Sequence, residues 1–127
     1  MKNPFWDNIF KSDLSESSQT ILTLKQVPIF EGLSAAELNI VSKIVHHREY
    51  VLDEFVFKSG TPGLAMYIIL QGEVIIQGLD AKGKDIKFSN LLKGDFFGEI
   101  ALISEESRSV NAVVKLPSKM VALFRSD

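Results

Sequence analysis

The chain has 127 residues, of which 46% are hydrophobic and 24% charged, and its formal net charge at pH 7 is -2. This length suits one domain with one hydrophobic core. The balance of 14 basic and 16 acidic residues argues against nucleic-acid binding, which usually requires a basic surface. The absence of cysteine excludes disulfides, thiolate metal ligands and cysteine nucleophiles. Because no apolar stretch has the length of a membrane span or a signal peptide, we expect a cytoplasmic protein without a membrane partner.

Residues 1–26 are expected to form an N-terminal arm followed by a helix. The arm, residues 1–12, is rich in aromatic side chains, and we expect it to pack on the domain or on a partner. A short helix is predicted from Leu14 to Gln26, since Pro28 disfavours its continuation.

A second helix is predicted from Ser34 onwards. Ser34-Ala35-Ala36-Glu37 has the spacing of a capping box, and apolar residues then recur at three- and four-residue steps: Leu38, Val41, Ile44 and Val45. His46-His47 is interpreted as an ordinary pair at the end of this helix. Adjacent residues project in different directions and no third histidine or cysteine supports them, so a metal site is not expected.

After Arg48 the pattern changes to short runs of β-prone residues separated by turn residues. The predicted strands are Tyr50 to Leu52, Phe55 to Phe57, Met66 to Leu70, Val74 to Ile76, Ile86 to Phe88, Val110 to Val114, and Met120 to Phe124. Regular short strands of this kind indicate an antiparallel sandwich or jelly roll preceded by helices. Lys82-Gly83-Lys84 is interpreted as a solvated hairpin tip.

The segment from Gly94 to Ser109 has the composition of a site for a small anion. Gly98 allows backbone amides to approach a ligand atom closely. If Glu99 to Leu102 forms a helical turn, its unpaired N–H groups point together at an anion. Arg108 can then supply a permanently charged, bidentate clamp.

The pairing of Arg108 has two interpretations. If Arg108 opens a strand, alternation places it on an apolar face with Val110, Ala112 and Val114, where an unpaired charge is costly. Either Glu99 or a bound anion would then be its partner. Since a carboxylate repels a phosphate, Glu99 suits a ligand that carries hydroxyls beside its charge, as a sugar phosphate does.

The order Phe97-Gly98-Glu99-Ile100-Ala101-Leu102, five residues, then Arg108-Ser109 resembles the phosphate-binding cassette of cyclic nucleotide-binding domains. That family includes the bacterial catabolite activator protein, regulatory subunits of cAMP-dependent kinase and cyclic nucleotide-regulated channels. Further segments resemble its structural glycines, strands and helical start: Pro28-Ile29-Phe30 with Leu33, Gly60, Met66-Tyr67-Ile68-Ile69, Gly72-Glu73-Val74 and Gly94-Asp95-Phe96-Phe97. The resemblance runs from about Val27 to Phe124 and implies a cyclic nucleotide-binding domain over residues 27–127.

The resemblance implies a role for each residue of the cassette. Glu99 would accept a hydrogen bond from the ribose 2′-hydroxyl, and Arg108 would bind the exocyclic phosphate oxygens. Gly98, Ile100 and Ala101 would contribute backbone around the ribose phosphate. The Ser109 hydroxyl would reach the phosphate or a guanine base, which requires a local bulge in the strand.

The remaining implications concern the base and its surroundings. The apolar wall near the base would come from Ile76, Phe88 and Leu91. cAMP is favoured over cGMP only as the commoner bacterial messenger. The lid helices and any DNA-binding module that follow the barrel in other members are expected to be absent, because this sequence ends at Asp127.

The resemblance thus implies an eight-stranded jelly-roll-like β-barrel with N-terminal helices that acts as a sensory or regulatory module. No catalysis, metal or cofactor is expected, and the ligand would be cAMP or cGMP. A homodimer or a protein partner remains open. One alternative is a degenerate member that has lost its ligand and serves as an interaction domain. Another is a small metalloenzyme of the cupin type.

Overall fold

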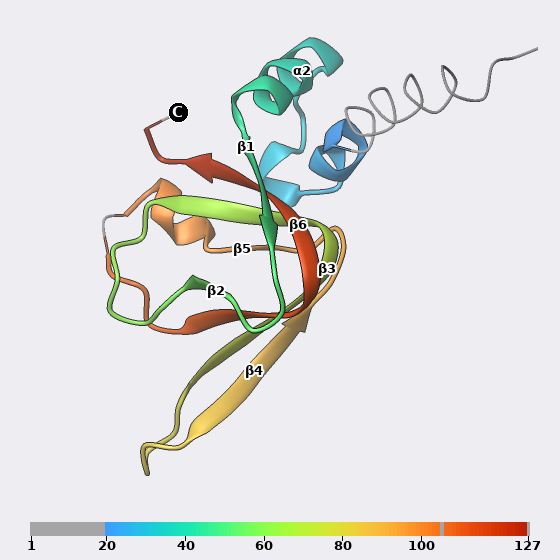
Figure 1. Cartoon of the computed structure of the whole chain (residues 1–127). Coiled ribbons are helices and arrows are strands. Elements are labelled where there is room, and N and C mark those ends of the chain that lie inside the picture. Colours follow the sequence, from blue (N-terminus) through green and yellow to red (C-terminus); the bar gives the residue numbers. More distant parts are fainter. Residues whose placement is uncertain (1–19, 105, 127) are drawn as a thin grey trace, which may run out of the picture. The chain divides into compact units, whose positions relative to one another are not determined.

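A computed structural model describes residues 20–104 and 106–126 (Figure 1). The chain divides into two compact units, residues 1–43 and 44–127, which are described separately. The predicted arm over residues 1–12 lies outside the described residues, as does the first part of the helix predicted from Leu14.

The described part of the first unit is helical. Residues 20–25 are helical, a 3-10 turn η1 spans Pro28–Phe30, and helix α2 spans Ala35–Ile44. The backbone N–H of Ser34 donates to Glu37 Oε1 at 3.0 Å, and the N–H of Glu37 donates to Ser34 Oγ at 3.1 Å. This reciprocal pair is the predicted capping box, and it confirms where α2 begins.

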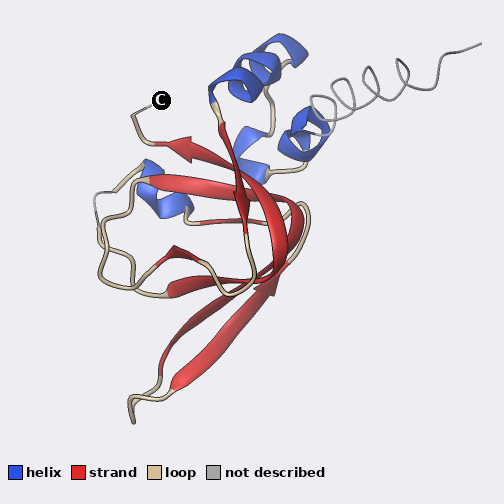
Figure 2. Ribbon diagram, in the orientation of Figure 1, coloured by secondary structure: helices blue, strands red, loops and turns tan. Residues whose placement is uncertain are grey.

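The second unit is an antiparallel sheet (Figure 2). Its strands are β1 (His46–Tyr50), β2 (Phe55–Phe57), β3 (Ala65–Leu79), β4 (Asp85–Leu91), β5 (Phe96–Phe97) and β6 (Asn111–Phe124), and the 3-10 turn η2 spans Glu99–Leu102. The strands follow the order β1-β6-β3-β4, with β2 paired to β6 and β5 paired to β3. The mainly β fold class is confirmed. The described residues form a six-stranded sheet, however, and eight strands are not confirmed.

The strand number differs because the residues Gln71-Gly72 and Leu116-Pro117-Ser118, which the sequence predicts as turns, lie inside long strands. β3 continues through Gly72, and β6 continues through Pro117 and Ser118. Between these strands the register shifts at Gln71 and Glu73. The hydroxyl of Ser118 accepts a hydrogen bond from the Glu73 N–H at 3.2 Å and donates one to the Leu116 carbonyl at 2.6 Å. The turn residues therefore produce a bulge in a continuous ladder and not a chain reversal.

The interpretation of His46-His47 as a helix-end pair is wrong. Both residues belong to β1, where His46 lies opposite Ala122 and His47 opposite Val121 on β6. The imidazole of His46 meets the Phe124 ring edge to face, with the ring centroids 4.9 Å apart. The pairing with β6, which is distant in the sequence, thus determines that this segment is a strand. The local sequence does not indicate that pairing.

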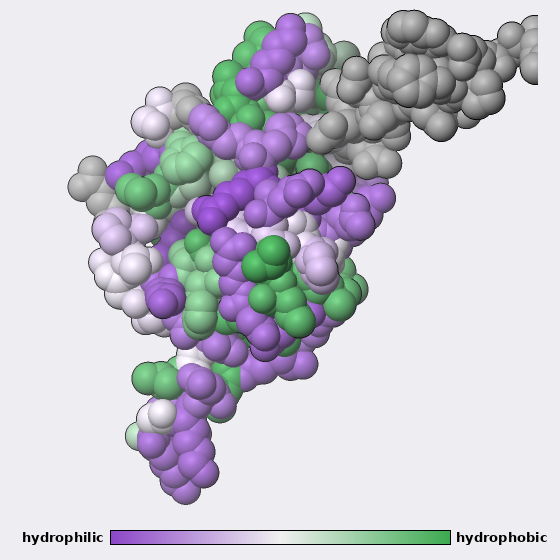
Figure 3. Space-filling view, in the orientation of Figure 1, coloured by the Kyte–Doolittle hydropathy of each residue, from purple (hydrophilic) through white to green (hydrophobic). Residues whose placement is uncertain are grey.

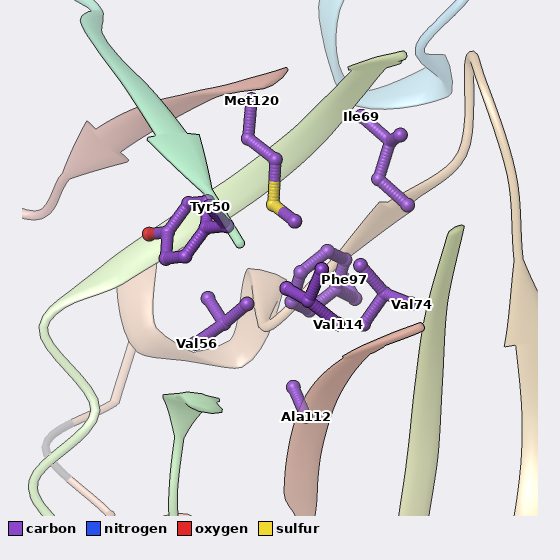
Figure 4. Close-up of a cluster of buried hydrophobic side chains, with 8 residues drawn as sticks. All are labelled: Tyr50, Val56, Ile69, Val74, Phe97, Ala112, Val114 and Met120. Carbon is purple, nitrogen blue, oxygen red and sulfur yellow. The ribbon is translucent and has the colours of Figure 1, made fainter. Parts of the chain in front are cut away.

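The hydrophobic core of the second unit lies between the strands (Figure 4). Ile69 and Val74 come from β3, and Val114 and Met120 from β6, and all four are at most 1% exposed. The cluster is completed by Tyr50, Val56, Phe97 and Ala112. Because Phe97 directly precedes Gly98, core packing fixes the position of Gly98 within the predicted anion-binding segment.

Candidate functional site

A pocket of about 230 Å³ lies at the end of β5, next to η2 and the segment before β6. Its lining residues are Phe57, Ile76, Phe97, Gly98, Glu99, Ile100, Ala101, Glu106, Ser107, Arg108, Ser109 and Val110. Residues 97–101 and 108–109, from the two halves of the predicted motif, therefore meet around one space.

Gly98 connects β5 to η2 in a conformation that favours glycine. Its φ is +78°, in the left-handed region. A Cβ atom at this position would lie 2.8 Å from Arg108 Nη1 and 3.3 Å from the Ala65 carbonyl oxygen. Glycine here thus allows both the turn and the close approach of the arginine. The amides of Glu99 and Ile100, at the start of η2, have no partner within the turn.

The backbone of Arg108 is held by the loop that follows β2. Its N–H donates to the Thr61 carbonyl at 2.8 Å, and its own carbonyl accepts from the Gly60 N–H at 2.7 Å. The condition that Arg108 opens a strand is not met, because β6 begins only at Asn111. Because Arg108 and Ser109 lie in a loop, their side chains do not have to point to opposite faces as they would in a strand. Both residues therefore line the same pocket without the predicted strand bulge.

The guanidinium of Arg108 is anchored on the protein. Nη1 donates to the Gly98 carbonyl at 3.1 Å, and Nη2 donates to the Ala65 carbonyl. The guanidinium carbon lies 4.2 Å from the centroid of the Phe57 ring, a cation–π contact. Together these contacts fix the direction of a side chain that would otherwise have many rotamers.

One nitrogen of this guanidinium is left without a partner. Within the described residues, Nε of Arg108 is buried and has no hydrogen-bond acceptor. Burial lowers the pKa of Arg108 from its ordinary value, while Tyr67 and Glu99 act in the opposite direction. A buried donor without an acceptor costs roughly 1–3 kcal/mol, more when it is charged. An anionic oxygen that accepted a hydrogen bond from Nε would remove that cost.

Glu99 offers a free carboxylate at the same pocket. The residue is exposed, and no ion pair joins Glu99 to Arg108 in the part of the chain that the structure describes. Of the two predicted partners for Arg108, Glu99 is thus not paired with it. The pocket combines a fixed cation with an unpaired hydrogen-bond donor, and an exposed carboxylate that can accept hydrogen bonds from hydroxyls.

Three aromatic rings lie behind the arginine. Phe57, Tyr67 and Phe97 are mutually packed, with ring centroids between 5.4 and 6.1 Å apart. Burial raises the pKa of Tyr67, and the charges of Arg108 and Arg48 act in the opposite direction. This cluster couples the guanidinium to the core through Phe57 and Phe97.

Seven of the nine predicted site residues line the pocket: Ile76, Gly98, Glu99, Ile100, Ala101, Arg108 and Ser109. Phe88 and Leu91 lie on β4 and are not part of the lining. Leu91 packs against the hydrophobic core, and the Phe88 ring covers Gly78.

Sequence reasoning missed five lining residues, namely Phe57, Phe97, Glu106, Ser107 and Val110. Phe97, Ser107 and Val110 directly flank predicted residues and Glu106 lies two positions before Arg108, so proximity in the sequence was the available signal. Phe57 has no such signal, because only the tertiary fold brings β2 to Arg108.

The sequence matches the family described as cyclic nucleotide-binding domain over residues 47–127. This chain belongs to that family. The domain family is regulatory and not catalytic, which confirms that this domain is not an enzyme. Among the described residues, no helix is long and apolar enough to cross a membrane.

Named relatives agree with the family assignment. The chain is 31% identical to the cyclic AMP receptor protein of Thermus thermophilus over 82% of this chain and 48% of the relative. The cAMP-bound regulatory domain of Toxoplasma gondii PKA has a TM-score of 0.79 and 26% identity, and the match covers 91% of this chain and 45% of that one. The regulatory subunit of a cAMP-independent protein kinase A from Trypanosoma cruzi, bound to guanosine, has a TM-score of 0.77 and 25% identity. That match covers 88% of this chain and 40% of the Trypanosoma chain. The chain spans about half or less of the length of the curated relatives it matches.

Proposed function

We propose that this cyclic nucleotide-binding domain binds cAMP in preference to cGMP at the pocket around Arg108, as the cytoplasmic sensory module of a regulatory protein. The observation that carries the proposal is the buried, unpartnered Nε of Arg108 beside the exposed carboxylate of Glu99. Arg108 binds the exocyclic phosphate, and Glu99 accepts a hydrogen bond from the ribose 2′-hydroxyl. The preference for cAMP rests on the cAMP named for the Thermus and Toxoplasma relatives.

The other pocket residues complete this arrangement. Backbone amides from Gly98 to Ala101 lie beside the ribose phosphate, and the Ser109 hydroxyl reaches a phosphate oxygen. Ile76 and Val110 supply apolar surface for the base. Glu99 sits beside the ribose, so its charge does not oppose the phosphate directly.

Glu99→Gln is the sharpest test, since the Glu99 side chain makes no hydrogen bond or ion pair among the described residues. We expect calorimetric titration of the unchanged protein with cAMP to give micromolar binding, weaker for cGMP. The Glu99→Gln variant keeps an acceptor oxygen and loses only the charge assistance of this hydrogen bond, roughly 1–1.5 kcal/mol, so its affinity for cAMP should fall about 5- to 10-fold. Its melting temperature without ligand should not change.

Glu49→Gln is the matched control, because it removes one exposed carboxylate on β1, whose nearest cation, Lys119, is 3.9 Å away. Full affinity of the Glu99→Gln variant would contradict the proposed site. Absence of binding to either cyclic nucleotide would contradict the function and favour a domain that has lost its ligand and serves in protein interaction.

A second candidate is a nucleoside without a phosphate. Two observations favour it: the Trypanosoma relative holds guanosine, and both terminal nitrogens of Arg108 already donate to backbone carbonyls. The Arg108→Lys substitution separates the two candidates, because it removes the planar guanidinium and keeps the charge. Weakened cAMP binding would support the phosphate site, whereas guanosine binding that Arg108→Lys leaves unchanged would support the nucleoside site.

A further inference from the structure

The hairpin formed by the end of β3 and by β4 projects from the rest of the second unit (Figure 1). β4 is the last strand in the sheet order, and within the described residues it pairs with β3 alone. All residues from Asp85 to Asn90 are exposed. The outer edge of β4 therefore presents backbone donors and acceptors that another strand can pair with.

The turn of this hairpin fixes which backbone groups face outwards. The N–H of Asp80 donates to the Lys84 carbonyl at 2.8 Å, and Gly83, with φ +79°, completes the turn. Hydrogen-bonded and non-hydrogen-bonded pairs alternate along an antiparallel ladder. Ile86 is thus bonded to β3 opposite Gly78, whereas the N–H and C=O groups of Asp85 and Lys87 point to the free edge.

The side chains along this edge alternate between charged and apolar. Asp85 and Lys87 share one face of β4, and neither forms an ion pair with another described residue. The ladder has an extra residue at Phe88, and there the Phe88 ring covers Gly78, the residue opposite Ile86. Ile86 and Phe88 thus lie on the other face, where they are 38% and 53% exposed. The view in Figure 3 shows a hydrophilic hairpin tip with hydrophobic surface closer to the sheet.

Only a few symmetric registers are open to two such edges. The twofold axis must lie midway between the two copies of one residue, because only then do the outward N–H and C=O groups of one strand face those of the other. We name each register by that residue. An axis at Asp85 places two aspartates opposite each other, and an axis at Lys87 places two lysines opposite each other, both of which are unfavourable. An axis at Ile86 places Asp85 of each copy opposite Lys87 of the other.

We propose that this free edge is a homodimerisation surface, on which β4 pairs antiparallel with β4 of a second copy of the chain about an axis at Ile86. Asp85 and Lys87 then exchange backbone hydrogen bonds across the axis, and their side chains form two ion pairs on one face. On the other face, the Ile86 and Phe88 side chains of both copies form one apolar strip. Because so short a contact buries a small area, the dimer is a weak one.

Charge reversal tests this register directly. Sedimentation equilibrium of the unchanged chain at concentrations up to several hundred micromolar should show a monomer–dimer equilibrium. In the proposed register, Lys87→Asp places two pairs of aspartates opposite each other, and Asp85→Lys places two pairs of lysines opposite each other. Because like charges repel, each of these single variants should be monomeric. The double variant Asp85→Lys, Lys87→Asp exchanges the charges and should dimerise again. A double variant that remains monomeric, or single variants that dimerise fully, would overturn the proposed register.

Single cysteines provide a second test, since the chain has none of its own. Under mild oxidation, Ile86→Cys should link two copies, because the two residues face each other across the axis. Asp85→Cys and Lys87→Cys should not link to themselves, although a mixture of the two should link to each other. A chain that stays monomeric at every concentration, or equal linkage at all three positions, would overturn the proposal. All of these side chains are exposed, so circular dichroism should show unchanged folding.

Discussion

Gly98 and Gly83 share one backbone conformation in very different surroundings. Their φ values are +78° and +79°. A Cβ atom on Gly98 would lie 2.8 Å from Arg108 Nη1, whereas one on Gly83 would have no neighbour within 4 Å. The two glycines therefore separate the cost of the backbone conformation from the cost of displacing the arginine.

We predict that Gly98→Ala and Gly83→Ala each lose about 1–2 kcal/mol of unfolding free energy through left-handed strain. Only Gly98→Ala should also weaken cAMP binding, by tenfold or more, because the arginine must move. Chemical denaturation and calorimetric titration of both variants measure the two effects. Equal cAMP affinity in the two variants would show that the anchor between Gly98 and Arg108 does not control the site.

At this scale the sequence was most informative where the site residues form one local motif. Gly98, Glu99 and Arg108 were predicted from spacing, and the structure brings them to one pocket. The fixing of Arg108 was not predictable, because it depends on the Ala65 carbonyl and the Phe57 ring, which reach it only through the fold. Phe88 and Leu91 were predicted from the family resemblance as part of an apolar wall, and apolar character does not separate core packing from ligand contact.

The long strands β3 and β6 carry a bulge whose packing has no spare room. Gly72, with φ +112°, approaches Ser118 so closely that an added Cβ would lie 2.6 Å from the Ser118 Cβ and 2.7 Å from its Cα. Since one of these contacts is with backbone, a side-chain rotation cannot relieve it. β3 and β6 can approach this closely at residue 72 only because that residue is glycine.

Gly72→Ala should therefore destabilise the fold strongly, by about 3 kcal/mol or more, because overpacking and left-handed strain add. Thermal and chemical unfolding measure the loss, and Gly83→Ala is the control for strain without crowding. Ser118→Ala in the same chain should not restore stability, since the contacts with Cα and Cβ remain. A Gly72→Ala variant as stable as Gly83→Ala would show that β3 and β6 can move apart at Gly72 and Ser118 at little cost in free energy.

Elements were predictable to the extent that their signals were local. The capping box located α2, and β-prone residues indicated most strands. The joining of two runs into β3, and of two into β6, was not predictable, because Gly72 and Pro117 indicate turns and only the facing strand makes them parts of a bulged ladder. The assignment of His46-His47 failed for the same reason, since β6 determines their pairing.

At the scale of the whole molecule, the second unit is held by a core that includes a buried phenol. The chain has two tyrosines, and Tyr50 is 3% exposed within the core cluster. Burial raises the pKa of Tyr50 to about 12, although the Arg48 guanidinium, 4.5 Å from its ring centroid, acts in the opposite direction. Burial also raises the pKa of Tyr67.

These raised pKa values make the fold sensitive to alkali. Between pH 10 and about 12 the unfolded chain loses the Tyr50 proton while the folded chain keeps it, so the folded state binds more protons and stability falls as pH rises. Denaturant unfolding at a series of pH values should show this decline, and it should be shallower in Tyr50→Phe. In the folded protein, phenolate absorbance should stay low at pH 10 and increase together with the loss of circular dichroism. Phenolate that forms at pH 10 in the intact fold would contradict the proposed cause, because the ring would then be ionising within the core.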